Sequence, residues 1–169
     1  MPVKLIISIF TQNNNLFEAI ENVLSRKFGP IDFESGMLDF NQTDYYEKEF
    51  GADLKRKFIS FKKLIKADDL WKIKTITNKL EKKFTKDNKR QVNLDPGYIT
   101  QANLILASTK DYSHRIYIKG GIYQELTLIF KEKTFWPLPW TYPDYQKKES
   151  IEIFIKIRNM LNSQLQANK

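Results

Sequence analysis

Two amphipathic helix patterns, each set between short strand-like runs, constrain the fold of this chain more than any other feature. The first spans residues 16–28, with Asn14 or Asn15 as the expected N-cap and Gly29-Pro30 as the stop signal. The second covers residues 68–84. Strand-like runs flank the two helices, over Val3–Phe10, Ile31–Phe40, Leu54–Phe61 and Gln91–Leu94. This order predicts an α+β fold with a ferredoxin-like βαββαβ core.

The rest of the chain is expected to extend this core by a C-terminal β-hairpin and a helix. Asp95-Pro96-Gly97 predicts a turn that ends the fourth strand. The segments after it are, in order, a short apolar helix over 99–107, a hairpin around Gly120-Gly121, a proline- and aromatic-rich loop over 135–145 and a last helix over 149–165. No internal repeat or linker interrupts the chain, so residues 1–169 are expected to form one domain.

Two smaller features are expected inside the core. Ser35-Gly36 predicts an interruption of the strand over residues 31–40, such as a bulge. Residues 43–50 are expected to form a short helix or turn that Gly51 closes.

The lack of cysteine and the single histidine, His114, exclude several classes of protein. Without cysteine there is no disulfide framework, no thiolate metal site and no cysteine nucleophile. One histidine cannot build a multi-histidine metal site. No apolar run approaches the ~20 residues that a membrane helix needs. We therefore expect a cytoplasmic protein that does not associate with membranes.

The formal net charge of +8 is concentrated in one part of the chain. Residues 48–90 contain 15 basic and six acidic side chains, so the remainder of the chain is close to neutral. Such a basic face could attract phosphates, as in nucleic-acid binding, or could be a solvated lysine-rich surface. Genome composition alone could also supply much of the lysine, because lysine codons are A/T-rich.

His114 is the most specific candidate for chemistry. A two-residue turn at Gly120-Gly121 would pair Lys119 with Ile122 and place His114 opposite Thr127, with Glu125 as its diagonal neighbour. A carboxylate beside an imidazole suits general acid or base catalysis. The alternative is a structural histidine that bonds to Glu125. In this register Arg115 points to the opposite face.

Three further segments carry candidate site residues. Asp95 stands where a strand is expected to end, and with Asp111 it is a candidate acid or base beside His114. Thr109 and Lys110 form a loop that could hold a phosphate. The chain has no GxxxxGKS or GxxxxGKT loop and no GxGxxG motif, so the common nucleotide-binding folds are not indicated. No metal site is predicted, although a divalent cation could bind oxygen ligands such as Asp95, Asp111, Glu125 and Asp144.

The ring-rich loop before the last helix is stiffened by three prolines. We expect Trp136 to be buried against the sheet, whereas Trp140 and Tyr142 could instead stack on a ligand base. These two rings are therefore candidate ligand-binding residues.

Several segments together resemble one family, the domain-of-unknown-function family numbered 4416. They are Phe28–Ile31, Thr43–Glu49, Asn93–Tyr98, Ala107–Tyr117 and Pro137–Tyr145, which are spread over nearly the whole chain. The resemblance implies that Tyr45, Lys110, Arg115 and several aspartates belong to the family pattern. On that basis Tyr45 and Arg115 join the candidate ligand-binding residues. The family brings no established activity with it.

The sequence supports two main hypotheses for function. The first is a binding protein for a phosphorylated ligand, either a nucleotide or a nucleic acid. The alternative is a small hydrolase of phosphate esters in which His114 and a nearby acidic residue form the acid–base pair. A protein–protein adaptor is a third option. The sequence identifies neither a cofactor nor an oligomeric state.

Overall fold

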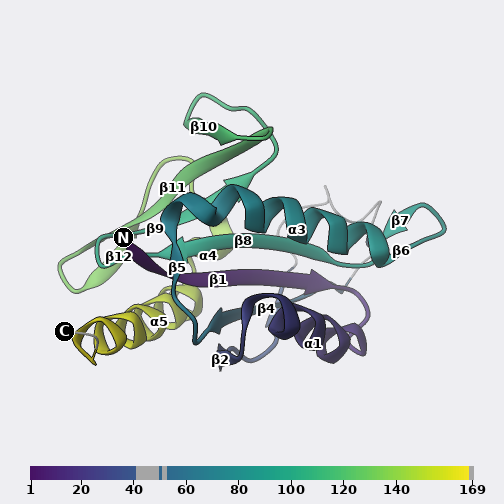
Figure 1. The fold of residues 1–169 in the computed structure, drawn as a ribbon, viewed down its shortest axis with the longest axis horizontal. Helices are drawn as coiled ribbons and strands as arrows, with labels where there is room; N and C mark the ends of the chain where they lie inside the picture. The colour runs from purple at the N-terminus through teal and green to yellow at the C-terminus, as the bar shows by residue number, and fades with distance from the viewer. Residues whose placement is uncertain (41–49, 51–52, 168–169) are drawn as a thin grey trace.

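The computed structural model describes residues 1–40, 50 and 53–167, which form a ten-stranded antiparallel sheet with helices on both faces and a separate two-stranded sheet, β6–β7 (Figure 1). The helices are α1 (Leu16–Phe28), α3 (Leu70–Lys83), α4 (Pro143–Gln146) and α5 (Lys148–Ala167), with a 3-10 turn η1 (Ala67–Asp69) before α3. The strands are β1 (Pro2–Thr11), β2 (Ile31–Glu34), β3 (Leu38–Asp39), β4 (Lys55–Phe61), β5 (Ile65–Lys66), β6 (Thr85–Lys86), β7 (Lys89–Arg90), β8 (Asn93–Ile99), β9 (Asn103–Ser108), β10 (Arg115–Lys119), β11 (Ile122–Lys131) and β12 (Thr134–Pro137). No helix in this described part is long and apolar enough to cross a membrane.

The strand β1 lies at the centre of the sheet, whose order is β10–β11–β9–β8–β1–β4–β2. All its residues after Pro2 are buried. Leu5 and Ile7 pack with residues of α1 and α3 on one face, whereas Ile6 packs with Phe154 and Ile157 of α5 on the other. Because alternate side chains of a strand point to opposite faces, this one apolar run joins two cores.

The first half of the chain folds largely as its sequence pattern predicts. The helix over residues 16–28 is confirmed as α1, and Gly29 ends it with a positive φ of 99°. Asn15 occupies the N-cap position, but its side chain makes no capping hydrogen bond. The strand over 31–40 is interrupted at Ser35-Gly36 and becomes β2 and β3. The short helix or turn expected over residues 43–50 lies outside the described residues, except for Phe50.

The expected turn at Asp95-Pro96-Gly97 is wrong, because these residues continue β8 across the sheet. Asp95 pairs with Ser8, Pro96 with Ile7 and Gly97 with Ile6 of β1. On its other side β8 pairs with β9 only over Gly97–Ile99. A Cβ at Gly97 would lie 2.3 Å from the Ile105 carbonyl oxygen, so glycine is needed for a close strand approach and not for a turn.

The apolar helix expected over 99–107 is also wrong, because this segment contains a tight turn and the strand β9. The turn follows Thr100, whose Oγ1 accepts hydrogen bonds from the backbone N–H groups of Ala102 and Asn103, both at 3.0 Å. β9 pairs with β8 along one edge and with β11 along the other. A short apolar run fits a buried strand or a buried helix equally well, and here strand pairing decides.

The hairpin at Gly120-Gly121 is confirmed, but its register is shifted by one residue. Lys119 pairs with Ile122 as predicted, and both turn glycines have positive φ. Beyond that pair Tyr117 lies opposite Tyr123, so Ile118 is an extra residue in β10. This bulge places Arg115 directly opposite Glu125, where the predicted register would have placed Ile116. The prediction that Arg115 points to the face opposite His114 and Glu125 is therefore wrong, because Arg115 contacts Glu125.

Candidate functional site

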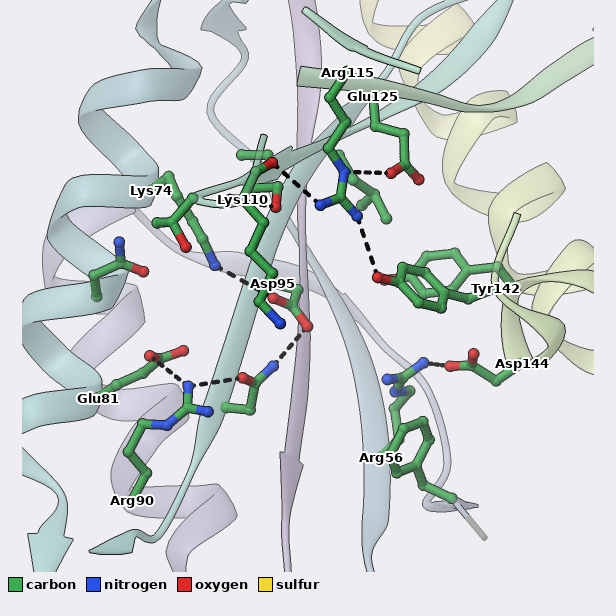
Figure 2. A pocket seen from close by; sticks show the side chains of 18 of the residues that line it. Arg56, Lys74, Glu81, Arg90, Asp95, Lys110, Arg115, Glu125, Tyr142 and Asp144 are labelled. Atoms are coloured by element: carbon green, nitrogen blue, oxygen red, sulfur yellow. Dashed lines mark hydrogen bonds and ion pairs between the residues drawn. The ribbon is translucent and has the colours of Figure 1, made fainter. Parts of the chain in front are cut away.

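A pocket of about 470 Å³ opens where β8 and β9 separate (Figure 2). Beyond their short ladder, Asn93 and Asp95 of β8 face Ala107 and Ser108 of β9 across this space. The ladder ends next to Pro96, which has no backbone N–H to donate. The Asp-Pro-Gly segment therefore opens a site in the sheet.

Ten charged side chains from several elements line the pocket. The basic ones are Arg56, Lys74, Lys82, Arg90, Lys110 and Arg115, and the acidic ones are Glu81, Asp95, Glu125 and Asp144. The lining thus carries an excess of positive charge. Figure 2 shows the Lys110 side chain pointing into the pocket toward Asp95.

The carboxylate of Asp95 is held by partners on both of its oxygens. Lys74 Nζ lies 3.3 Å from Oδ1 and also donates to the Leu94 carbonyl oxygen at 3.1 Å. Asn93 Nδ2 donates to the other oxygen, Oδ2, at 2.6 Å. Lys74 is buried, whereas the Asp95 side chain is 32% exposed, so this oriented carboxylate is accessible to a ligand.

Glu81 connects helix α3 to the start of β8. Its Oε1 accepts a hydrogen bond from the Leu94 N–H at 2.7 Å, and its Oε2 pairs with Arg90 at 3.1 Å. Arg90 also donates to Asn93 Oδ1 at 3.1 Å. Burial raises the pKa of the Glu81 carboxyl, against the opposing effect of the Lys74 charge. This network fixes the lower wall of the pocket in Figure 2.

Arg115 organises the opposite wall through three hydrogen bonds. Nε donates to Glu125 Oε2 at 2.8 Å, one terminal nitrogen donates to the Lys110 carbonyl at 3.2 Å, and the other donates to the Tyr142 hydroxyl at 3.2 Å. Burial opposes the charge of the guanidinium, but its contact with Glu125 outweighs this effect and raises the pKa of Arg115. The guanidinium is thereby charged and fixed in orientation.

His114 lies behind this wall and contacts Glu125, as the sequence predicts. Its Nε2 donates to the same Glu125 oxygen that binds Arg115, at 2.9 Å. The imidazole also stacks on Trp140, with ring centroids 5.1 Å apart and an angle of 10° between the planes. Because residue 114 is in the turn before β10, both His114 and Arg115 can reach one carboxylate.

Arg56 and Asp144 form a buried ion pair at the base of the pocket. The rings of Phe10, Phe40, Phe58 and Tyr145 surround the guanidinium, and Phe40 is nearest at 4.2 Å from Cζ to the ring centroid. Burial raises the pKa of the Tyr145 phenol, which stays uncharged. The base of the pocket is thus one charged pair within an aromatic shell.

The structure brings together six of the ten candidate residues from the sequence. Those that line the pocket are Asp95, Thr109, Lys110, Arg115, Glu125 and Tyr142. His114, Asp111 and Trp140 lie outside its lining, and Tyr45 falls outside the described residues. Trp136 is 40% exposed, so its expected burial is wrong. Within the described residues, no three carboxylate or histidine side chains are grouped to hold a metal ion.

Five charged pocket residues were missed as site candidates, namely Arg56, Lys74, Glu81, Lys82 and Arg90. Two of them had a signal in the sequence. Leu70, Lys74, Thr77 and Glu81 follow helical spacing and are all buried on one stripe of α3. Charged residues on a buried stripe indicate a polar site, whereas Arg56 lies between two lysines at the start of β4 and had no such signal.

The basic segment over residues 48–90 does not form one solvated face in its described part. Arg56, Lys57 and Lys74 are buried. Lys57 forms ion pairs with Glu21 and Glu34, and none of these three residues lines the pocket. The expectation of a single basic surface is therefore corrected: part of this charge is internal, and part of it lines the pocket.

Comparison with known proteins relates the chain to one family. A family model described as "Domain of unknown function (DUF4416)" matches residues 1–161. The match spans every residue that lines the pocket. No curated protein and no solved structure matches the chain.

Proposed function

The chain belongs to the DUF4416 family, and we propose that it binds a phosphorylated small molecule in the pocket between β8 and β9. The observation that carries this proposal is the convergence of six basic side chains, from elements far apart in the sequence, on one pocket. Guanidinium groups match the geometry of phosphate oxygens, and ammonium groups add positive charge. A volume of about 470 Å³ lies within the range of small-molecule sites.

A small molecule fits the placement of the charge better than a nucleic-acid polymer does. Binding to a polymer needs an exposed row of cations that follows the phosphate backbone. Here Arg56 and Lys74 are buried at the pocket, while Lys55 and Lys72 on the surface are paired with Asp39 and Asp69. Two of the pocket cations are therefore reached only from inside the pocket, although exposed lysines such as Lys79, Lys83 and Lys86 remain on the surface of α3 and β6.

Ligand-dependent thermal melts and calorimetry test this proposal. We expect inorganic pyrophosphate, sugar phosphates or nucleotides to raise Tm, whereas the matching unphosphorylated sugars and nucleosides do not, because only ligands that bind the folded state stabilise it. Lys82→Ala should weaken binding of the phosphorylated ligand about fivefold, or about 1 kcal/mol. Lys83→Ala is the matched control, because Lys83 is exposed on the same helical turn but lies outside the pocket lining.

The result that overturns the proposal is equally specific. If no phosphorylated small molecule binds but a single-stranded oligonucleotide does, the protein binds the polymer instead. In that case contact with four phosphates predicts that affinity falls by about fiftyfold between 50 and 200 mM salt. Equal effects of Lys82→Ala and Lys83→Ala on a bound ligand would place the site elsewhere.

Hydrolysis of a phosphate ester is a second candidate, favoured by the position of Asp95. Its carboxylate is oriented by Lys74 and Asn93 and remains open to the pocket. In this scheme Asp95 accepts a proton from water, the water oxygen bonds to phosphorus, the bond from phosphorus to the alcohol oxygen breaks, and that oxygen takes a proton from solvent as the alcohol leaves. His114 does not line the pocket, so we assign it no contact with the substrate. Release of phosphate that Asp95→Asn abolishes, with ligand binding retained, would establish this activity.

We also infer that β8–β1–β4–β2, with α1 and α3, is a ferredoxin-like unit. Its support is the antiparallel pairing of these four strands in that order and the packing of both helices into one core. β8 is the edge strand of this unit, and the pocket lies beside it. β9 pairs with this edge, and the β10–β11 hairpin continues the sheet beyond β9.

A further inference from the structure

We propose that the ligand is a nucleotide, with its phosphate at Arg115 and its base stacked on the ring of Tyr142. This inference rests on the proposed function and names the class of phosphorylated ligand. It follows from a juxtaposition: a pocket-lining aromatic ring and a pocket-lining guanidinium are one hydrogen bond apart. A nucleotide likewise joins a flat ring to a phosphate through a short linker, its pentose.

The Tyr142 ring is held in place from its backbone and from its hydroxyl. The preceding residue, Thr141, is buried; its Oγ1 accepts from the Leu138 N–H at 2.8 Å and donates to the Thr127 carbonyl at 2.5 Å. Pro143 follows directly and starts α4. The Tyr142 hydroxyl accepts from Arg115. A ring fixed in this way loses little conformational entropy when a base stacks on it.

The ring is also accessible, although it lies in a polar site. Tyr142 is 48% exposed, whereas the neighbouring Tyr145 is buried in the core with Phe58 and Phe154. About half of the Tyr142 side chain is therefore accessible to a ligand, unlike that of Tyr145. Stacking of a base on such a ring is tolerant of base identity, because every base has a π-face.

The guanidinium of Arg115 has donors left for a phosphate. It carries five N–H groups, and three of them are used by Glu125, Lys110 and Tyr142. The ring of Tyr112 lies 5.5 Å from its Cζ atom. The two remaining N–H groups are on the terminal nitrogens, and guanidinium N–H groups of this kind bind phosphate oxygens.

The other aromatic side chains of this region are less suited to the same role. Trp140 is stacked on His114, and its Nε1 donates to the Leu126 carbonyl at 2.8 Å. Tyr112 and Tyr117 are exposed but do not line the pocket. Tyr142 alone among these four lines the pocket next to Arg115.

Two variants of Tyr142 separate the ring from its hydroxyl. Tyr142→Phe keeps the ring and removes the hydrogen bond to Arg115, whereas Tyr142→Leu removes both. The probes are adenosine 5′-monophosphate and ribose 5-phosphate, which share a phosphorylated pentose and differ in the base. Tyr117→Leu is the matched control, because Tyr117 is exposed but lies outside the pocket lining.

We expect the nucleotide to bind the wild-type protein about tenfold tighter than ribose 5-phosphate, as one stacked base provides. Tyr142→Phe should retain this ratio, Tyr142→Leu should bring it close to one, and Tyr117→Leu should leave both affinities unchanged. Equal binding of the two probes to the wild-type protein, or an unchanged ratio in Tyr142→Leu, would overturn the base site while leaving phosphate binding intact. If neither these probes nor any other phosphorylated small molecule binds, the proposed function itself is wrong.

Discussion

Two neighbouring hairpins, β8–β9 and β10–β11, both depend on glycine, but for opposite reasons. Gly97 lies in the middle of a strand, where its missing side chain allows the Ile105 carbonyl to approach. Gly120 and Gly121 form a turn, where each adopts a positive φ, and no atom lies within 4 Å of a Cβ built at Gly121. The first hairpin needs space and the second needs backbone freedom. The same residue type can thus let two strands approach closely or reverse the chain.

The two hairpins also contribute differently to the pocket. β8 lies deep in the sheet, and its Asp95 is fixed by Lys74 from α3. β10 is an edge strand, and its Arg115 is fixed by Glu125, by a loop carbonyl and by Tyr142. We therefore expect changes at β8 to affect folding most, and changes at the β10–β11 hairpin to have smaller effects on stability.

The largest effect is expected for Gly97→Ala. A methyl group there meets the backbone of β9, which cannot move aside, so we expect the free energy of unfolding to fall by about 3 kcal/mol. Gly121→Ala is the matched change in the other hairpin and should cost about 1 kcal/mol, the price of a left-handed alanine. Urea denaturation of both variants measures the difference. Equal losses would show that the two glycines serve the same purpose.

His114→Ala should have an intermediate effect. It removes a hydrogen bond to the buried carboxylate of Glu125 and the stacking on Trp140, so we expect a loss of about 1–2 kcal/mol. For a chain of this length that loss lowers Tm by about 2–8 °C. His114→Gln, which can still donate to Glu125, should recover part of it. An unchanged melt together with lost turnover of a phosphorylated substrate would make His114 catalytic instead.

The smallest effect is expected from the titration of Glu81, which joins α3 to β8. Burial raises the pKa of this carboxyl above its ordinary value of 4.5, so the folded state holds the proton more tightly than the unfolded chain does. The contribution of this carboxyl to the free energy of unfolding is therefore fully present below pH 4.5. It is lost as pH rises through the raised pKa of the folded state. Glu81→Gln, which does not titrate, should lack this decrease.

Denaturation of the wild type and Glu81→Gln at several values between about pH 4 and pH 7 tests this sign. The variant should gain stability relative to the wild type as pH rises. The comparison uses the slope with pH, because an amide at position 81 also changes the contact with Arg90 at every pH. A relative loss of stability with rising pH would show that the Arg90 and Lys74 charges outweigh burial.

The sequence by itself predicts the helices and turns that depend on interactions between residues close together in the chain. The periodicity and stop signal of residues 16–28 predict α1 with its bounds, and the apolar stripe of α3 appears in the spacing of its residues. The Gly120-Gly121 turn and the contact between His114 and Glu125 were also predictable, because a tight turn brings nearby residues together. Such features depend on residues close in the chain.

Only the tertiary structure decided the course of β8 and the position of Arg115. Asp95-Pro96-Gly97 carries a strong turn signal, but pairing with β1 along the whole strand outweighs it, and β1 is some ninety residues away in the sequence. A single extra residue in β10, Ile118, changes the face of the hairpin on which Arg115 lies, so that Arg115 contacts Glu125. Strand register and long-range pairing are set by contacts between distant segments. For that reason the sequence by itself identified many of the pocket residues, whereas the fold alone determined which of them meet.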